Sequence, residues 1–174
     1  MRSVRYAVAM SLDGFIAGPH GEADWIEIDP TVDVAAFFKK FYAQFDIALM
    51  GRRTFEVVGG PIEGMSTYVF SRTLSPLACQ GVTVLAENGI DEVRRLRAQD
   101  GRDIWLFGGG GLFGSLAAAQ LVDKVELGVM PVFLGEGIPV MSAIRERVHL
   151  KLLEIDRSGP GGLSLTYEVD YADK

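Results

Sequence analysis

Cysteine and histidine are scarce in this chain. Cys79 is its only cysteine, and His20 and His149 are its only histidines among 174 residues. A lone thiol excludes an internal disulfide and any metal site built from several thiolates. The two histidines lie far apart, and neither has a pattern of other metal ligands beside it. We therefore expect no metal site, and nothing around Cys79 indicates a reactive thiol.

Long apolar runs are also missing, although 48% of the residues are hydrophobic. No uninterrupted apolar stretch approaches the roughly 20 residues that a membrane-spanning helix needs. The apolar stretch near the N-terminus covers only residues 6–10, whereas the apolar core of a signal peptide takes about 7–15 residues. We expect a cytoplasmic protein with no membrane partner.

Basic residues are in the minority, with 17 Lys and Arg against 23 Asp and Glu and a formal net charge of −6. This balance argues against a general attraction to nucleic acids or anionic membranes, so an anionic ligand must be held by local geometry. The length suits one domain. Because no repeat, linker or change of composition divides the chain, we expect a single domain over residues 1–174.

Strand and helix patterns alternate along most of the chain. Short apolar stretches predict strands over residues 4–10, 46–50, 67–71, 82–86, 104–107, 125–132, 148–156 and 163–169. Helices are predicted over residues 31–44, 52–58, 89–99 and 112–121. Alternation up to residue 121 predicts a largely parallel sheet with helices on both faces. The closing run of strands, whose last two are joined by a predicted turn at residues 158–162, predicts an antiparallel edge.

The strongest motif is a run of four glycines at residues 108–111, between a predicted strand and a predicted helix. Such a turn has no Cβ atoms, so its backbone N–H groups can approach a phosphate, and the helix N-terminus attracts the negative charge. The motif predicts a phosphate-binding turn. A tight turn without a ligand is the alternative.

Gly109, Gly111 and Gly114 also have the spacing of the dinucleotide-binding fingerprint of a Rossmann fold. The surroundings differ, because that fingerprint follows the first strand of its unit and has an acidic residue about 20 positions later. Glu126 comes too early and near the start of its strand, and no further helical crossover follows. We therefore reject the Rossmann interpretation.

Two other predicted strands end in cationic residues. After residues 46–50 the chain continues with Gly51, Arg52, Arg53 and Thr54 at the start of a predicted helix. Arginines in a first helical turn oppose the helix dipole, so an anion bound there would explain them. Solvent-exposed arginines are the alternative.

The other cationic strand end is Ser71-Arg72, after residues 67–70. Taken alone it resembles an ordinary loop. Because ligands of α/β sheets bind at the carboxyl ends of the strands, Arg72 can join Arg52 and Arg53 in one basic pocket. The planar guanidinium group matches phosphate, so the pocket suits a phosphorylated cofactor.

Together these segments resemble the dihydrofolate reductase-like fold and, within it, the reductase domain of riboflavin biosynthesis. The motifs occur in consistent order over nearly the whole chain: SLDGFIAG at 11–18, MGRRTFE at 50–56, FSR at 70–72, FGGGGL at 107–112 and PVFLGEG at 131–137. The resemblance implies a single α/β domain with a central mixed, mostly parallel sheet of about eight strands. It also implies helices on both faces and an antiparallel C-terminal edge.

The resemblance implies NADPH bound across the strand ends, and a homodimer. It assigns the nicotinamide to Ala9, Ile16 and Ala17, and the 2′-phosphate of the adenosine to Ser71 and Arg72. The remaining predicted cofactor contacts are with phosphates and comprise Gly51, Arg52, Arg53, Thr54, Gly108, Gly109, Gly110, Gly111 and Leu112.

The predicted substrate pocket is lined by Trp25, Val34 and Phe38, with Asp13 and Asp24 as candidate catalytic residues and polar substrate contacts. Dihydrofolate reductases carry an acid on the first helix at the position of Val34. The neighbouring Asp33 would point about 100° away around a helix. This departure argues against folate reduction.

The resemblance thus implies an NADPH-dependent reductase that transfers hydride to a C=N or C=O bond of a small heterocyclic or ribosylamino-pyrimidine substrate. A 5-amino-6-(5-phosphoribosylamino)uracil reductase is the type expected in riboflavin biosynthesis. The deaminase half often fused to that reductase has no counterpart in these 174 residues. A dihydrofolate or pteridine-type reductase, and an NADPH-binding module without turnover, are the alternatives.

Overall fold

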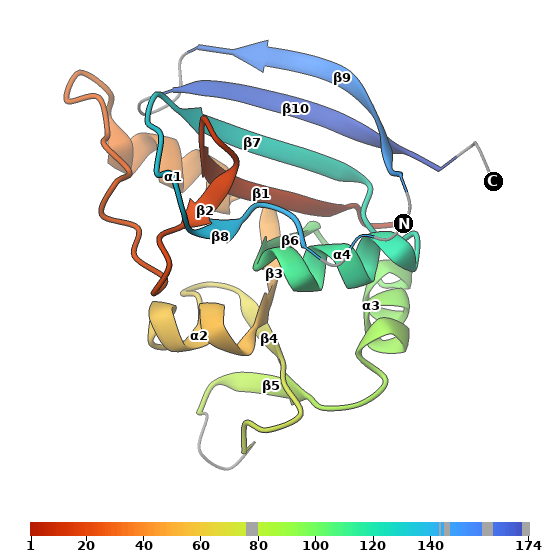
Figure 1. Ribbon diagram of the computed structural model, residues 1–174. Helices are drawn as coiled ribbons and strands as arrows, with labels where there is room; N and C mark the ends of the chain where they lie inside the picture. Colours follow the sequence, from red (N-terminus) through yellow and green to blue (C-terminus); the bar gives the residue numbers. More distant parts are fainter. Residues whose placement is uncertain (76–79, 143, 145–146, 158–161, 172–174) are drawn as a thin grey trace.

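The computed structural model describes residues 1–75, 80–142, 144, 147–157 and 162–171 (Figure 1). An eight-stranded sheet lies at its centre, in the order β5 (Val82–Leu85), β4 (Ser66–Phe70), β3 (Phe45–Gly51), β6 (Asp103–Gly108), β1 (Val4–Ser11), β7 (Lys124–Met130), β10 (Leu163–Asp170) and β9 (His149–Asp156). The strands from β5 to β7 in this order pair in parallel. β10 is antiparallel to both β7 and β9, which confirms the predicted mixed α/β domain with its antiparallel edge.

Helices cover both faces of the sheet, as predicted. α1 (Val34–Tyr42) and α2 (Arg52–Val58) pack on one face, where Phe41 and Phe55 contact a cluster that includes Ala48, Met50 and Trp105. α3 (Gly89–Ala98) and α4 (Gly110–Ala118) cover the other face. Because successive strand residues point to opposite faces, we name these the α1 face and the α4 face.

The larger core lies on the α4 face. Strand residues such as Tyr6 and Leu49 are buried there against Phe113 and Leu116 of α4. The rings of Tyr6 and Phe113 stack with their centroids 4.4 Å apart, and the Tyr6 hydroxyl donates a 2.6 Å hydrogen bond to the Val140 carbonyl. Each such side chain contributes about 1.5–3 kcal/mol when fully buried, so this layer holds the sheet in register.

Two helices begin at different residues from those predicted. The helix predicted from residue 31 begins only at Val34, because the Asp33 carboxylate caps it by accepting a 2.9 Å hydrogen bond from the N–H of Ala36. The helix predicted from residue 112 begins at Gly110, so part of the glycine run forms its first turn. α2 has its predicted bounds and ends at Gly59, which has a φ of 80° and adopts the left-handed conformation.

Two short strands were not predicted. β2 (Phe15–Ala17) and β8 (Ile138–Pro139) pair antiparallel in a separate small sheet. Stretches this short carry no readable periodicity. Residues 158–161 of the predicted turn, and Cys79, lie outside the described residues.

Candidate cofactor- and substrate-binding cleft

A cavity of about 1230 Å³ opens on the α1 face. It begins at the carboxyl ends of β3 and β6 and continues beneath α1 along β1, β7 and β10. Pockets for one small ligand usually measure about 300–1,000 Å³. The cavity exceeds this range, as a site for a large ligand or for two adjacent ligands would. We call its two halves the turn half and the aromatic half.

The turn half is built from two strand-to-helix turns. Because β3 and β6 are neighbours in the sheet, the β3–α2 turn and the β6–α4 turn lie together. A Cβ built on Gly109 would lie 3.8 Å from Thr54 Oγ1 and 3.9 Å from Ile16 Cδ1, so β2 approaches the same point. The predicted cofactor residues that line the cavity here are Gly51, Arg52, Arg53, Thr54, Gly109, Gly110, Gly111 and Leu112.

Both helices of the turn half begin without a side-chain cap. The N-cap residues are Gly51 for α2 and Gly109 for α4, and neither helix start receives a hydrogen bond from a capping side chain. Uncapped N–H groups of this kind, together with the helix dipole, attract anions. The two arginines add positive charge at the surface, although Arg52 also approaches Glu56, with 3.6 Å between Nη1 and Oε1.

Two of the four glycines are also required by the local structure of the backbone. Gly108 is buried, does not line the cavity, and has a φ of 137°, which disfavours any residue with a side chain. A Cβ on Gly110 would lie 2.7 Å from the Pro139 carbonyl oxygen, so that backbone contact requires glycine. Gly109 and Gly111 have more room, and they offer an open backbone surface to the cavity.

Ser71 and Arg72 do not line the cavity. Ser71 is buried, and its hydroxyl accepts hydrogen bonds from the N–H groups of Thr73 and Leu74 at 3.2 and 2.9 Å. This geometry shapes the loop after β4. Arg72 is exposed. The structure therefore brings Arg52 and Arg53 to the cavity wall but leaves Arg72 outside it.

The junction of the two halves is apolar. Ala9, Ile16 and Ala17, the residues predicted beside the nicotinamide, all line it. Ala9 of β1 lies beside Gly128 of β7 in the sheet. These side chains form an apolar surface on which a ring can lie.

The aromatic half carries rings from α1 and β6: Phe37, Phe38, Phe41, Tyr42, Trp105 and Phe107. Trp105 and Phe107 stack with their ring centroids 4.3 Å apart, and Phe41 meets Trp105 edge-on at 5.2 Å. The Trp105 indole N–H donates a 2.9 Å hydrogen bond to the Ala7 carbonyl, which fixes the ring. A wall of fixed aromatic rings favours planar ligands.

Glu126 gives the aromatic half a carboxylate that the sequence reasoning missed as a site residue. It lines the cavity, and Arg5 holds it through two hydrogen bonds, of 2.5 Å from Nε and 2.8 Å from Nη2. Burial lowers the pKa of Arg5, but its hydrogen bonds and its charge interaction with Glu126 outweigh that effect and raise the pKa above its usual value. The guanidinium also lies 4.6 Å from the centroid of the Phe45 ring.

The pairing of β1 with β7 explains why Arg5 contacts Glu126 and why the sequence did not predict Glu126 as a site residue. In that register Ala7 lies opposite Glu126, so the side chains of Arg5 and Glu126 share the α1 face. More than a hundred residues separate the two strands in sequence. The one available signal was a charged residue inside each of two otherwise apolar strands, because such charges need a partner.

The predicted catalytic residues lie elsewhere. Asp13 accepts hydrogen bonds from Ser11 Oγ at 2.7 Å and from the N–H groups of Leu134 and Gly135, and these bonds hold its pKa below the usual value. It thereby ties the β1–β2 turn to the segment after β7 and does not line the cavity. Asp24 is exposed and also lies outside the lining.

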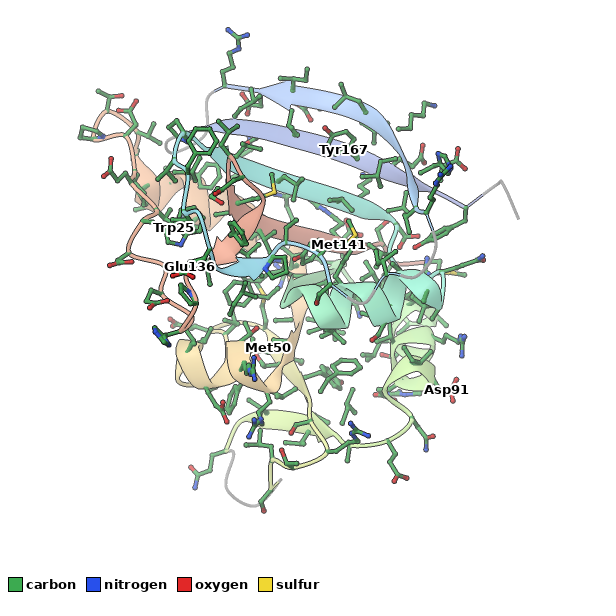
Figure 2. The ribbon with its side chains drawn as sticks, in the orientation of Figure 1. Trp25, Met50, Asp91, Glu136, Met141 and Tyr167 are labelled. Carbon is green, nitrogen blue, oxygen red and sulfur yellow. The ribbon has the colours of Figure 1, made fainter. Side chains whose placement is uncertain are left out.

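Of the predicted substrate contacts, Phe38 lines the cavity and Trp25 and Val34 do not. Trp25 lies on the loop before α1 (Figure 2), and its indole N–H donates a 3.1 Å hydrogen bond to the Glu22 carbonyl. Val34 is the first residue of α1, and α1 contains no acidic residue.

None of the helices in the described part of the chain has the length and apolar character that crossing a membrane requires.

Solved structures share this architecture. A putative riboflavin biosynthesis protein from Shewanella sp. PV-4 superposes with a TM-score of 0.80, at 23% identity, over 98% of this chain and 99% of its own. A dihydrofolate reductase from Enterococcus faecalis, complexed with NADP(H) and RAB-propyl, gives 0.67 at 20% identity over 97% and 96% of the chains. These likenesses confirm the predicted dihydrofolate reductase-like fold.

A third structure is longer. The diaminohydroxyphosphoribosylaminopyrimidine deaminase/5-amino-6-(5-phosphoribosylamino)uracil reductase from Thermotoga maritima has a TM-score of 0.68 at 17% identity. The match covers 97% of this chain but 57% of that one. This chain is therefore similar to one part of a longer protein.

Two relatives and one family model match the chain by sequence. The chain is 32% identical to the uncharacterized protein YyaP of Bacillus subtilis (strain 168), over 95% of its own length and 94% of the relative. It is 30% identical to the uncharacterized protein YwjB of the same organism, over 83% and 86% of the two chains. The model of the RibD C-terminal domain matches residues 2–164, nearly the whole chain. The chain belongs to the RibD C-terminal domain family.

Proposed function

We propose that this protein is an NADPH-dependent reductase that transfers hydride to a C=N or C=O bond of a small heterocyclic substrate of the ribosylamino-pyrimidine type. The observation that carries the proposal is that two glycine-containing strand-to-helix turns and a wall of aromatic rings line one cavity. Membership of the RibD C-terminal domain family supports a reductase. The likeness to a reductase complexed with NADP(H) supports the cofactor.

The turn half fits a phosphorylated dinucleotide. It combines two uncapped helix starts with Arg52, Arg53 and the Thr54 hydroxyl, all on one wall. In the proposal, N–H groups of residues 109–111 and the Arg52 guanidinium hold the phosphates. Ser71 and Arg72 remain proposed contacts of the 2′-phosphate, reached from outside the cavity wall.

NADPH, when bound, supplies the hydride and its electron pair. In the proposal the chain orients the ring, because Ala9, Ile16 and Ala17 form the apolar junction between the two halves. The aromatic wall excludes water from the neighbouring half, which strengthens every polar contact made there. In the proposal, these residues would hold the nicotinamide ring at the junction, facing an acceptor in the aromatic half.

The aromatic half accommodates the acceptor ring. Phe38 and Phe41 of α1 lie on one side, and residues of β1, β7 and β10 form the floor. A carboxylate offers about four lone-pair positions, and Arg5 uses two of those on Glu126. Glu126 can therefore accept a further hydrogen bond from an N–H group of the substrate. Amino-substituted pyrimidines carry such N–H groups.

The test is an assay of NADPH oxidation by the purified chain with 5-amino-6-(5-phosphoribosylamino)uracil, followed by absorbance and by identification of the ribityl product. Dihydrofolate is the comparison substrate, and we expect little turnover because α1 carries no acid. Turnover of dihydrofolate instead would replace the proposal by a folate-type reductase. NADPH binding without oxidation in the presence of either acceptor would make the chain a cofactor-binding module.

A further inference from the structure

The two edges of the central sheet differ. β5, at one edge, has four residues, and three of them are half-buried. β9, at the other edge (Figure 1), has eight residues, of which all but Asp156 are exposed. Long exposed edge strands invite pairing with another strand, and proteins usually shorten, cover or charge them. β9 therefore needs a partner or a protecting device.

β9 carries charged side chains and a bulge, but it also exposes large apolar side chains. Leu150, Leu152, Leu153 and Ile155 are 39%, 48%, 48% and 55% exposed. Within the described residues, β9 has a strand beside it only on the β10 side. Its apolar side chains and its free edge together indicate a docking surface.

The sequence of β9 is complementary to itself when reversed. In an antiparallel pair of two such strands centred between Leu152 and Leu153, Lys151 lies opposite the partner's Glu154. The same register places Leu150 opposite the partner's Ile155. Parallel pairing in register would oppose Lys151 to the partner's Lys151 and Glu154 to the partner's Glu154, and like charges directly opposite each other are destabilising.

A bulge makes this antiparallel register possible. In a regular strand, residues 151 and 154 would point to opposite faces. In β9, Leu152 lies opposite Tyr167 of β10 and Glu154 lies opposite Thr166, so Leu153 is an extra residue. Because of that extra residue, Lys151 and Glu154 point to the same face, the α1 face.

The apolar residues follow the same rule. Leu150 lies opposite Val169 and Ile155 opposite Leu165, so both point to the α4 face, as does Tyr167 (Figure 2). Around a two-fold axis at the bulge, apolar residues then meet apolar residues on one face and opposite charges meet on the other. A two-fold interface repeats each contact.

We propose that β9 pairs antiparallel with β9 of a second copy of this chain around a two-fold axis at Leu152 and Leu153, so that the sheet continues from one protomer into its partner. The self-complementary charges select a second copy over an unrelated strand. The proposal does not depend on the reaction that the cleft supports, since none of the residues of β9 lines the cavity. It gives the homodimer implied by the resemblance a specific interface.

The test is the dimer dissociation constant of the full chain, measured by sedimentation equilibrium, for charge variants of β9. We expect the wild type to be a dimer. Lys151→Glu and Glu154→Lys should each weaken the dimer by about tenfold or more, because each change places two like-charge pairs in the interface. The double variant K151E/E154K should restore dimerisation, since the pairs are then only exchanged.

Lys40→Glu is the matched control, because Lys40 is exposed on α1, which packs on β3, and four strands separate β3 from β9 in the sheet. Circular dichroism and thermal unfolding check that every variant folds. A monomeric wild type would overturn the proposal. A dimer unaffected by both single changes would place the interface elsewhere, and single changes that the double variant does not rescue would overturn the register.

Discussion

The two halves of the cleft bind by different means. The turn half presents backbone N–H groups and two arginines from contiguous segments, at the starts of α2 and α4. The aromatic half presents rings from α1 and β6 and the Glu126 carboxylate of β7, on segments far apart in the sequence. Backbone groups recognise the phosphate common to a class of cofactors, whereas placed side chains discriminate among substrates. In the proposed function, the turn half therefore determines the cofactor class and the aromatic half determines the substrate.

The largest expected effect concerns Gly110 in the turn half, and it tests whether this glycine is required for folding. Gly110→Ala should lower the free energy of unfolding by about 1–3 kcal/mol, because the new Cβ would lie 2.7 Å from the Pro139 carbonyl oxygen. Urea denaturation measures this. Gly111→Ala is the control, since its Cβ would meet nothing closer than 3.6 Å, at Ser142 Oγ. Equal stability of the two variants would show that Gly110 is not required by packing.

The second prediction tests whether the aromatic half acts on the substrate alone. Glu126→Gln keeps an oxygen for Arg5 but removes the charge, so kcat/KM for the uracil substrate should fall about tenfold or more, while the Kd of NADPH stays within about twofold. Steady-state kinetics and a binding titration measure the two quantities. Glu168→Gln is the control, because Glu168 lies on β10, is exposed and is outside the cavity lining. A parallel loss of NADPH affinity would mean that the two halves are not independent.

The third prediction tests the arginines on either side of the cavity wall. Arg52→Ala should weaken NADPH and NADH alike by about tenfold, because a charged hydrogen bond to a phosphate that both share is lost. Arg72→Ala should weaken NADPH only, and by a smaller factor, because Arg72 is exposed and outside the wall. Titration of both cofactors against each variant measures this. An unchanged NADPH preference in Arg72→Ala would remove that residue from the site.

The smallest effect concerns a residue outside both halves. The hydrogen bonds that Asp13 accepts hold its pKa below the usual value, so its stabilising contribution is present above the pKa of the unfolded chain and is lost as the pH falls through the lower, folded pKa. The thermal stability of Asp13→Asn should therefore lie slightly below that of the wild type near neutral pH and converge with it in acid. Turnover should change little at neutral pH, and a loss comparable with that of Glu126→Gln would return Asp13 to the catalytic site.

The same contrast explains what could be predicted from the sequence. α2 has its predicted bounds because an apolar strand, Gly51 and the left-handed Gly59 all lie within a short segment. The glycine run and the arginines were found for the same reason, although their roles remain predictions. Asp24 and Trp25 lie in a loop whose residues Ala23 and Ile26 line the cavity, yet neither of them is part of the lining. The orientation of single side chains along a loop cannot be read from the sequence.

The pair of Arg5 and Glu126 could not be found in this way. Their contact depends on which strand lies beside β1 and on a register that places Ala7 opposite Glu126. Both are set by packing across the whole sheet, and a one-residue slip would turn Glu126 to the other face. β2 and β8 could not be predicted from the sequence, because their stability comes from pairing with each other.

The most direct test of the account is a titration of the Trp25→Phe variant with NADPH and, separately, NADH, following the fluorescence of Trp105. Trp105 lines the cavity and stacks on Phe107, whereas Trp25 lies outside the lining. We predict saturable quenching by both cofactors, with NADPH bound more tightly. The absence of quenching by either cofactor would contradict the central claim that the turn half binds a phosphorylated nicotinamide cofactor.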